Sequence, residues 1–321
     1  MLDTTLDVHD LQPTTETHRE EVIDGLRREN KRLPSKLFYD KRGSQLFEDI
    51  CQLDEYYLTR TELASMDEHA AAMARCLGEN VVLVELGSGA SLKTRILLDH
   101  LHRPSGYVPV DISREHLEQS AASINEDYPR LPVAPVCADF TQPFRLPANV
   151  SGAGHAVVYF PGSTIGNFPP DEAIQLLRNI REICDDDGGL LIGIDRKKDI
   201  ATLEAAYNDS EGVTAQFNLN MLSRINDELE TNFDEEQFEH AAHFNPQHGR
   251  IEMHLVSTCD QTVRLNGHQF EFEDGETICT EFSYKFSIGQ FSEMASQAGF
   301  RLQQSWSDKE ELFSVLYLTA E

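Results

Sequence analysis

Short apolar runs alternate with amphipathic stretches from about residue 62 to residue 199. Runs of this length, rich in Val, Ile, Leu and Phe, predict buried strands, while apolar residues at helical spacing predict helices between them. The expected strands are 81–86, 106–110, 133–137, 155–160 and 189–194, and the expected helices are 62–76, 91–102, 114–127 and 170–184. Strands that alternate with helices predict a parallel sheet built from βαβ units.

The pattern changes after residue 199. Residues 200–230 predict helices, whereas 250–258, 268–273 and 277–286 alternate apolar and polar residues as antiparallel strands do. The C-terminal part returns to the first style, with a helix at 288–299 and strands at 301–306 and 313–319. We therefore expect an α/β core interrupted by an inserted mixed α+β domain. The expected bounds are 62–199 and 284–321 for the core, 20–61 and 200–283 for the second domain, and 1–19 for a flexible N-terminus.

Charge and composition narrow the function classes. The 321 residues carry a formal net charge of -28, from 55 Asp and Glu against 27 Lys and Arg. This disfavours nucleic acid and anionic membranes as partners, because both require a basic face, and salt adaptation would also produce such an acidic chain. The N-terminus lacks a signal-peptide pattern and no run of about 18 apolar residues occurs. We expect a cytoplasmic monomer whose six scattered cysteines are free thiols.

A glycine-rich turn follows the first expected strand of the core. The segment "GSGASLKT" (87–94) has the length of a phosphate-binding P-loop, but Leu92 occupies the position of its second required glycine. The same leucine replaces the third glycine of the dinucleotide fingerprint. An acid at the strand end, Glu85, followed by Gly87 and Gly89 is typical of the S-adenosylmethionine loop. Backbone amides at a helix start, together with Lys93, suit the carboxylate of that ligand.

Two further expected strands end on acidic residues. Asp111 follows the second strand, and Asp139 with Phe140 follows the third. A carboxylate there can accept hydrogen bonds from ribose hydroxyls or an adenine amino group, and a phenyl ring can pack on the base. Each aspartate alone could equally cap a helix. The set of three strand ends favours a class I, Rossmann-like methyltransferase sheet.

The loop after the fourth strand, "FPGSTIGNF" (160–168), offers small polar groups, among them Gly162 and Asn167, that could orient an amine. It contains no Cys or His for a covalent mechanism, and a plain turn is the alternative. His240, His243 and His248 lack the spacing of a known zinc motif. We expect scattered surface histidines and no metal.

Six long motifs lie in both expected domains: "KLFYDKRGSQLFEDICQLDEYYLTRTE" (36–62), "VELGSGASLKTR" (84–95), "FPGSTIGNF" (160–168), "AYNDSEGVTAQFNLN" (206–220), "RIEMHL" (250–255) and "TEFSYKF" (280–286). They resemble the histidine-specific Nα-methyltransferase family of ergothioneine biosynthesis. The similarity covers about residues 20–321, nearly the whole chain. It implies transfer of three methyl groups from S-adenosylmethionine to the α-amine of L-histidine, which gives hercynine.

The resemblance also implies roles for individual residues. Asn167 and Tyr39 would orient the reacting groups, and Asn167 with Gly162 would lie beside the amine. The S-adenosylmethionine site would include Tyr39, Gly87, Lys93, Asp111, Asp139 and Phe140. The histidine site would include Tyr56, Gly162, Asn167, Tyr207, Met253, Glu281 and Ser283.

The positions implied for the imidazole are chemically consistent. Glu281 and Ser283 are two residues apart on an expected strand, so they share one face. A carboxylate accepts the imidazole N–H while a hydroxyl serves the other nitrogen. Met253 would pack on the ring, although a methionine between Ile251 and Leu255 could be plain core. The alternatives are methylation of another aromatic amino acid or amine such as tryptophan, a non-catalytic S-adenosylmethionine-binding protein, and a nucleotide-dependent oxidoreductase.

Overall fold

The computed structural model describes residues 6–89, 92–184 and 186–321. The chain forms two compact units, and three segments contribute to the first. Unit 1 consists of Met1–Gln12, Leu58–Lys197 and Lys285–Glu321, and unit 2 of Pro13–Tyr57 and Lys198–Tyr284. The chain thus passes between units at 12/13, 57/58, 197/198 and 284/285, and the last three lie beside the expected 61/62, 199/200 and 283/284.

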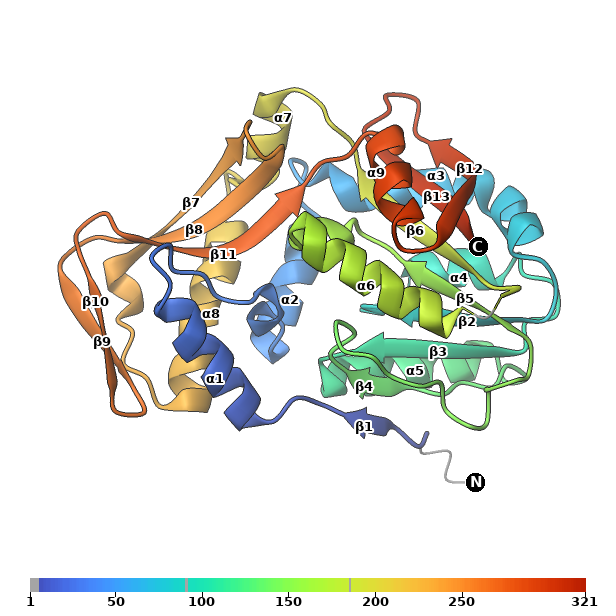
Figure 1. The fold of residues 1–321 in the computed structure, drawn as a ribbon, viewed down its shortest axis with the longest axis horizontal. Coiled ribbons are helices and arrows are strands. Elements are labelled where there is room, and N and C mark those ends of the chain that lie inside the picture. The colour runs from blue at the N-terminus through green and yellow to red at the C-terminus, as the bar shows by residue number, and fades with distance from the viewer. Residues whose placement is uncertain (1–5, 90–91, 185) are drawn as a thin grey trace. The chain divides into compact units, whose positions relative to one another are not determined.

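Unit 1 is built on an eight-stranded sheet in the order β1-β4-β3-β2-β5-β6-β13-β12 (Figure 1). Strands β1 to β6 run parallel, while β13 is antiparallel to both β6 and β12. The bounds are β1 His9–Leu11, β2 Val81–Leu86, β3 Gly106–Asp111, β4 Val136–Ala138, β5 His155–Phe160, β6 Gly189–Asp195, β12 Phe300–Ser307 and β13 Phe313–Ala320. The expected parallel α/β sheet is confirmed.

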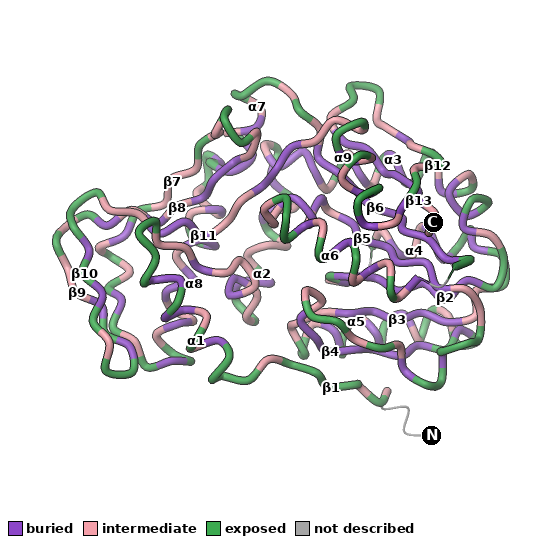
Figure 2. The backbone as a smooth tube through the Cα atoms, viewed as in Figure 1, coloured by how far each residue is buried: buried purple, intermediate pink, exposed green. Residues whose placement is uncertain are grey.

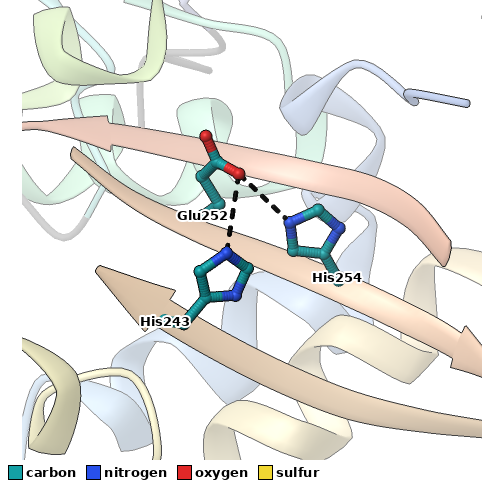
Figure 3. Close-up of side chains that lie close together, drawn as sticks. All are labelled: His243, Glu252 and His254. Carbon is teal, nitrogen blue, oxygen red and sulfur yellow. Dashed lines mark ion pairs between the residues drawn. The ribbon is translucent and has the colours of Figure 1, made fainter. Parts of the chain in front are cut away.

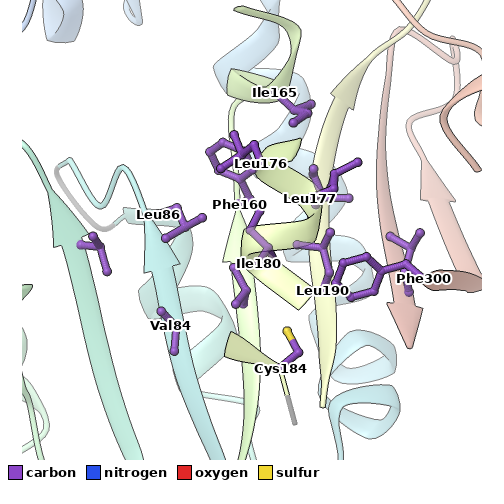
Figure 4. Packing of buried hydrophobic residues seen from close by; sticks show 14 of the residues in the cluster. Val84, Leu86, Phe160, Ile165, Leu176, Leu177, Ile180, Cys184, Leu190 and Phe300 are labelled. Atoms are coloured by element: carbon purple, nitrogen blue, oxygen red, sulfur yellow. The ribbon is translucent and has the colours of Figure 1, made fainter. Parts of the chain in front are cut away.

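Helices cover both faces of this sheet, which explains why its central strands are apolar on both sides. Figure 2 shows β2, β5 and β6 buried along most of their length. One face packs on α3 Tyr57–Leu77, α4 Leu92–Leu98 and α5 Arg114–Asp127, through residues such as Met66 and Leu97. The other face packs on α6 Pro170–Ile183 and α9 Ile288–Ser296. Figure 4 shows part of that second core, where Leu177 and Ile180 of α6 lie near Leu190 and Phe160.

Unit 2 combines helices with antiparallel strands. Its three-stranded sheet has the order β11-β8-β7, and a separate hairpin pairs β9 with β10. The strands are β7 Phe238–Asn245, β8 Arg250–Ser257, β9 Gln261–Leu265, β10 His268–Phe272 and β11 Thr277–Tyr284. The helices are α1 Thr15–Leu26, α2 Lys41–Ile50, α7 Ile200–Ala205 and α8 Val213–Leu229, with 3-10 turns η1 Ser35–Phe38 and η3 Glu235–Gln237. The expected mixed α+β insertion is confirmed.

The structure contains elements that the sequence prediction lacks. Within the expected flexible segment 1–19, residues 9–11 form β1 and residues 15–19 begin α1, while residues 1–5 lie outside the described part of the chain. β1 pairs parallel with β4, and α1 begins at Thr15 with Thr14 as its side-chain cap. Strands β7 and β9 have no counterpart in the prediction. The side chains of β7 are mostly partly exposed and show no apolar alternation.

Within the residues that the structure describes, no helix combines the length and apolar character needed to cross a membrane.

Candidate functional site

The glycine turn after β2 has free space beside its backbone. Gly87 and Gly89 have φ angles of 71° and 44°, a region that favours glycine. A Cβ atom built on either residue meets no atom of the described chain within 4 Å beyond its neighbours. The N–H of Gly87 donates to the carbonyl of Val110 at 2.8 Å, which holds the turn against the end of β3. Ala90 and Ser91 of the predicted loop lie outside the described residues.

The two strand-end aspartates organise the turns in which they lie. Asp111 accepts hydrogen bonds from the N–H of Gly89 at 3.2 Å and of Ser113 at 2.9 Å. Asp139 accepts from the N–H and the hydroxyl of Thr141 at 3.0 and 2.6 Å. Burial raises the pKa of Asp111, against the effect of these donors. Neither carboxylate caps a helix directly. The alternative role of these aspartates as helix N-caps is therefore not what the structure shows.

The aromatic residue beside Asp139 also has a defined position. Phe140 lies edge-on to Phe160 at the end of β5, with ring centroids 5.4 Å apart. Because β2, β3, β4 and β5 are parallel, their carboxyl ends lie at one edge of the sheet. The structure therefore brings Gly87, Asp111, Asp139 and Phe140 to one edge of unit 1.

The loop after β5 contains two consecutive residues with positive φ, Gly162 at 76° and Ser163 at 59°. A serine in this conformation is uncommon and must be held by its surroundings. The hydroxyl of Ser163 accepts a hydrogen bond from the N–H of Asp195 at 2.8 Å. The 3-10 turn η2, Thr164–Asn167, follows directly and ends at the predicted Asn167, which is partly buried.

A buried acid that the sequence prediction missed joins this loop to α4. Glu62 of α3 has a fully buried side chain and forms an ion pair with Lys93 at 2.5 Å. The same Glu62 oxygen accepts a hydrogen bond from the N–H of Gly162 at 2.9 Å. Lys93, expected to bind a ligand carboxylate, thus already has a carboxylate partner in unit 1. Its contact with a ligand stays a prediction. Nothing in the local sequence distinguishes Glu62 from other acidic residues on helices, because only tertiary packing places it beside Lys93 and Gly162.

Glu85 at the end of β2 points into the core rather than into the glycine turn. It is 2% exposed, and the hydroxyl of Tyr107 donates to it. Burial raises the pKa of Glu85 to about 7, while the hydrogen bond from Tyr107 and the charge of Lys93 oppose that rise. The acid that makes the strand end typical of the S-adenosylmethionine loop is therefore part of a buried polar cluster.

Unit 2 gathers a second group of predicted residues, which we call the tyrosine cluster: Tyr39, Tyr56, Tyr207, Met253, Glu281 and Ser283. On the sheet, Glu281 is the register partner of Met253, and Ser283 that of Ile251. The hydroxyl of Tyr207 donates to Oγ of Ser283 at 2.7 Å. The rings of Tyr56 and Tyr207 meet edge to face, with centroids 6.3 Å apart. Glu281 and Ser283 therefore share one strand face with Met253, as the spacing predicts.

Tyr39 completes this cluster through aromatic contacts. Its ring lies 5.8 Å from that of Phe47 and 6.0 Å from that of Phe217, and Phe47 contacts Tyr56. Burial, followed by the proximity of Tyr207, holds the pKa of Tyr56 well above its ordinary value. Tyr56 is therefore a neutral phenol near pH 7, able to donate a hydrogen bond but unable to act as a base.

Local packing fixes the segment that carries Tyr39. Asp40 caps α2 by accepting from the N–H of Gly43 at 2.6 Å, and Asn220 of α8 donates to the same carboxylate at 2.9 Å. A Cβ on Gly43 would lie 1.7 Å from the carbonyl oxygen of Phe38, so only glycine fits. Asn220 was not predicted as a contributor, and its signal is its place in the "FNLN" motif, where a polar residue occupies a buried helix face.

The three predicted surface histidines differ in environment. His240 is partly buried, contacts the carbonyl of Tyr207 and the amide of Asn218, and has a pKa lowered by burial. The expectation of a surface position is wrong for His240, because β7 packs on α8. His248 is exposed in the turn after β7. His243 is exposed but lies beside Glu252 and His254.

Comparisons with known proteins match almost the whole chain. A family model described as "Histidine-specific methyltransferase, SAM-dependent" matches residues 18–320. The histidine N-alpha-methyltransferase of Mycobacterium tuberculosis is 39% identical over 296 residues, which cover 91% of each chain. Ergothioneine biosynthesis protein 1 of Neurospora crassa is 30% identical over 86% of this chain and 32% of its own length. A solved magnesium protoporphyrin IX methyltransferase from Synechocystis with bound SAM gives a TM-score of 0.49 at 9% identity, covering 91% of this chain and 100% of that chain.

Proposed function

The chain belongs to the family of S-adenosylmethionine-dependent histidine-specific methyltransferases, and we propose that it trimethylates the α-amine of L-histidine to give hercynine in ergothioneine biosynthesis. Its mostly parallel sheet is the class I, Rossmann-like methyltransferase sheet. The observation that carries the choice of histidine is the shared strand face of Glu281, Ser283 and Met253 within the tyrosine cluster.

The strand-end groups of unit 1 suit S-adenosylmethionine. The open backbone at Gly87 and Gly89 leaves room for a ligand to approach closely, where side chains would fill the space. Asp111 and Asp139 have carboxylate oxygens for the ribose hydroxyls and the adenine amino group, and Phe140 has a ring for the base. S-adenosylmethionine would supply the electrophilic methyl group when bound here.

The tyrosine cluster suits the imidazole of histidine. Glu281 would accept the imidazole N–H, and a serine hydroxyl that accepts from Tyr207 can donate its own hydrogen to the other ring nitrogen. Such a pair would select one tautomer. An amino acid without those nitrogens would lose the hydrogen bond to this partly buried carboxylate and would therefore bind more weakly. Met253, 2% exposed, would pack against the ring.

Alignment of the amine, rather than acid–base catalysis, would supply much of the rate. An α-amine has a pKa near about 8, so its neutral form is accessible without a strong base. Tyr56, a phenol whose pKa is raised by burial, would accept or donate a hydrogen bond while it stays protonated. Asn167 and Tyr39 would orient the amine lone pair toward the methyl group.

A mass-spectrometric assay tests the proposal. Purified full-length chain is mixed with S-adenosylmethionine and an equimolar panel of histidine, tryptophan, tyrosine and histamine. We expect histidine alone to gain up to three methyl groups. Methylation of tryptophan or histamine instead would contradict the role of Glu281 and Ser283, while cofactor binding without any methylation would contradict the enzymatic function.

A further inference from the structure

A group of side chains on the outer face of the unit 2 sheet has the composition of a metal site. His243 lies on β7, and Glu252 and His254 lie on β8 (Figure 3). Their ligand atoms all lie within 4.8 Å of one another. This group does not include any residue of the tyrosine cluster.

Strand register explains why the three side chains meet. His243 is paired directly with Glu252, and His254 is two residues further along β8. Residues two apart on a strand share a face, and a directly opposed residue lies on that same face. The two imidazole rings stack 5.1 Å apart with an interplanar angle of 12°. Met253, between Glu252 and His254, points to the opposite face of the sheet.

The carboxylate of Glu252 is already oriented by its neighbours. Its Oε1 atom accepts from the Nε of Arg250 at 2.7 Å and from the side-chain amide of Asn245 at 3.0 Å. Its Oε2 atom faces the two histidines, 3.7 Å from Nε2 of His243 and 3.4 Å from Nε2 of His254. Hydrogen bonds of this kind to one oxygen are how proteins orient a metal-binding carboxylate.

We propose that His243, Glu252 and His254 bind one divalent transition-metal ion of the zinc type. Ligands about 2.0–2.1 Å from a tetrahedral Zn²⁺ are about 3.4 Å apart, close to both distances from Oε2 of Glu252. Two imidazoles and one carboxylate suit such ions, and water would complete the coordination because the His243 side chain is 55% exposed.

The chemistry of His254 supports this site. Both of its ring nitrogens are buried and neither makes a hydrogen bond of good geometry among the described residues, while Nε2 has an ion-pair contact with Oε2 of Glu252 at 3.4 Å. A buried ring nitrogen without a hydrogen bond is costly, and a metal ion would provide a ligand bond in its place. The remaining gap closes by rotation of the exposed His243 ring.

Zinc titration of the untagged full-length chain tests the proposal. Binding is followed by competition with a chelating dye at about pH 7.5. We expect one Zn²⁺ per chain, with His243→Ala weakening the affinity about tenfold or more, since even outer-shell changes cost that much. His248→Ala, an exposed histidine in the neighbouring turn, is the matched control and should leave the affinity unchanged.

Two results would overturn the site. One is the absence of stoichiometric binding to the wild-type chain. The other is unchanged affinity in both His243→Ala and His254→Ala, which would place the ion elsewhere, for example on the exposed thiol of Cys76. His243→Ala removes an exposed side chain, so its folding should be intact, and thermal unfolding in the absence of metal checks this. The proposal does not depend on methyltransferase activity, and hence failure of one leaves the other unaffected.

Discussion

The strand-end groups of unit 1 and the tyrosine cluster of unit 2 are assembled in different ways. Asp139 is held by its own turn, and Asp111 by its own turn together with the neighbouring glycine turn. Ser283 is instead held by Tyr207, 76 residues away, and Asp40 by Asn220, 180 residues away. The first arrangement follows from the parallel sheet, whereas the second requires distant segments to pack correctly. We therefore expect binding of the methyl donor, S-adenosylmethionine, to tolerate changes that abolish binding of the methyl acceptor, histidine.

The largest expected effect comes from Gly43→Ala. Its Cβ would lie 1.7 Å from the carbonyl of Phe38, so α2 or the Tyr39 segment must move, at a cost of about 3 kcal/mol or more. Gly87→Ala, where a positive φ is unfavourable for alanine but the space is open, should cost only about 1–2 kcal/mol. Urea unfolding of both variants measures the difference. Equal stability of the two would contradict the close packing described for Gly43.

The Glu281→Ala variant separates the effect on histidine from the effect on S-adenosylmethionine. We expect kcat/KM for histidine to fall about a hundredfold, because the imidazole N–H would lose a charged acceptor. S-adenosylmethionine affinity, measured by calorimetry, should stay within about twofold. Glu271→Ala, at an exposed position of β10, is the matched control. An equal loss of affinity for S-adenosylmethionine and for histidine would instead show that Glu281 has a structural role.

The variants Asp111→Asn and Asp111→Ala test S-adenosylmethionine binding by the strand-end groups of unit 1. We expect the alanine variant to bind S-adenosylmethionine about tenfold to a hundredfold more weakly, since it loses hydrogen bonds to a charged group. Asparagine keeps one oxygen that can still accept from Gly89 or Ser113, so it should lose less. Unchanged cofactor affinity in both variants, measured by calorimetry, would contradict the ribose assignment.

The smallest expected effect is the pH dependence of Glu85→Gln. The folded pKa of Glu85 is about 7, above its ordinary value of 4.5, so the folded state binds the proton more tightly. Between these values stability falls as pH rises, because the unfolded chain releases the proton first, and above pH 7 the loss is complete. The glutamine variant should therefore gain about 1–3 kcal/mol relative to wild type at pH about 8 and almost nothing near pH 4.5. Urea unfolding at both pH values measures this, and a larger gain at low pH would reverse the sign.

Individual residues show how far the sequence prediction reached. β2 and β5 begin and end at the predicted residues, because continuous apolar runs bounded by turns leave little choice. β7 was missed because its partly exposed side chains carry no periodic signal. The candidate metal site also lacks a signal in the local sequence. The spacing of His243 from His240 and His248 in the sequence indicates no metal site, whereas Glu252 and His254, which lie beside His243, belong to the adjacent strand.

The sequence by itself determined the α/β core, the inserted α+β part, the methyltransferase family and the pairing of Glu281 with Ser283 on one face. Each of these depends on residues close together in the chain or on long motifs. Only the tertiary structure decided that Glu62 joins Lys93 to Gly162, that Glu85 is buried against Tyr107, and that His243 meets His254. These contacts join residues on different elements, and their positions depend on strand register and helix packing, which local patterns do not encode.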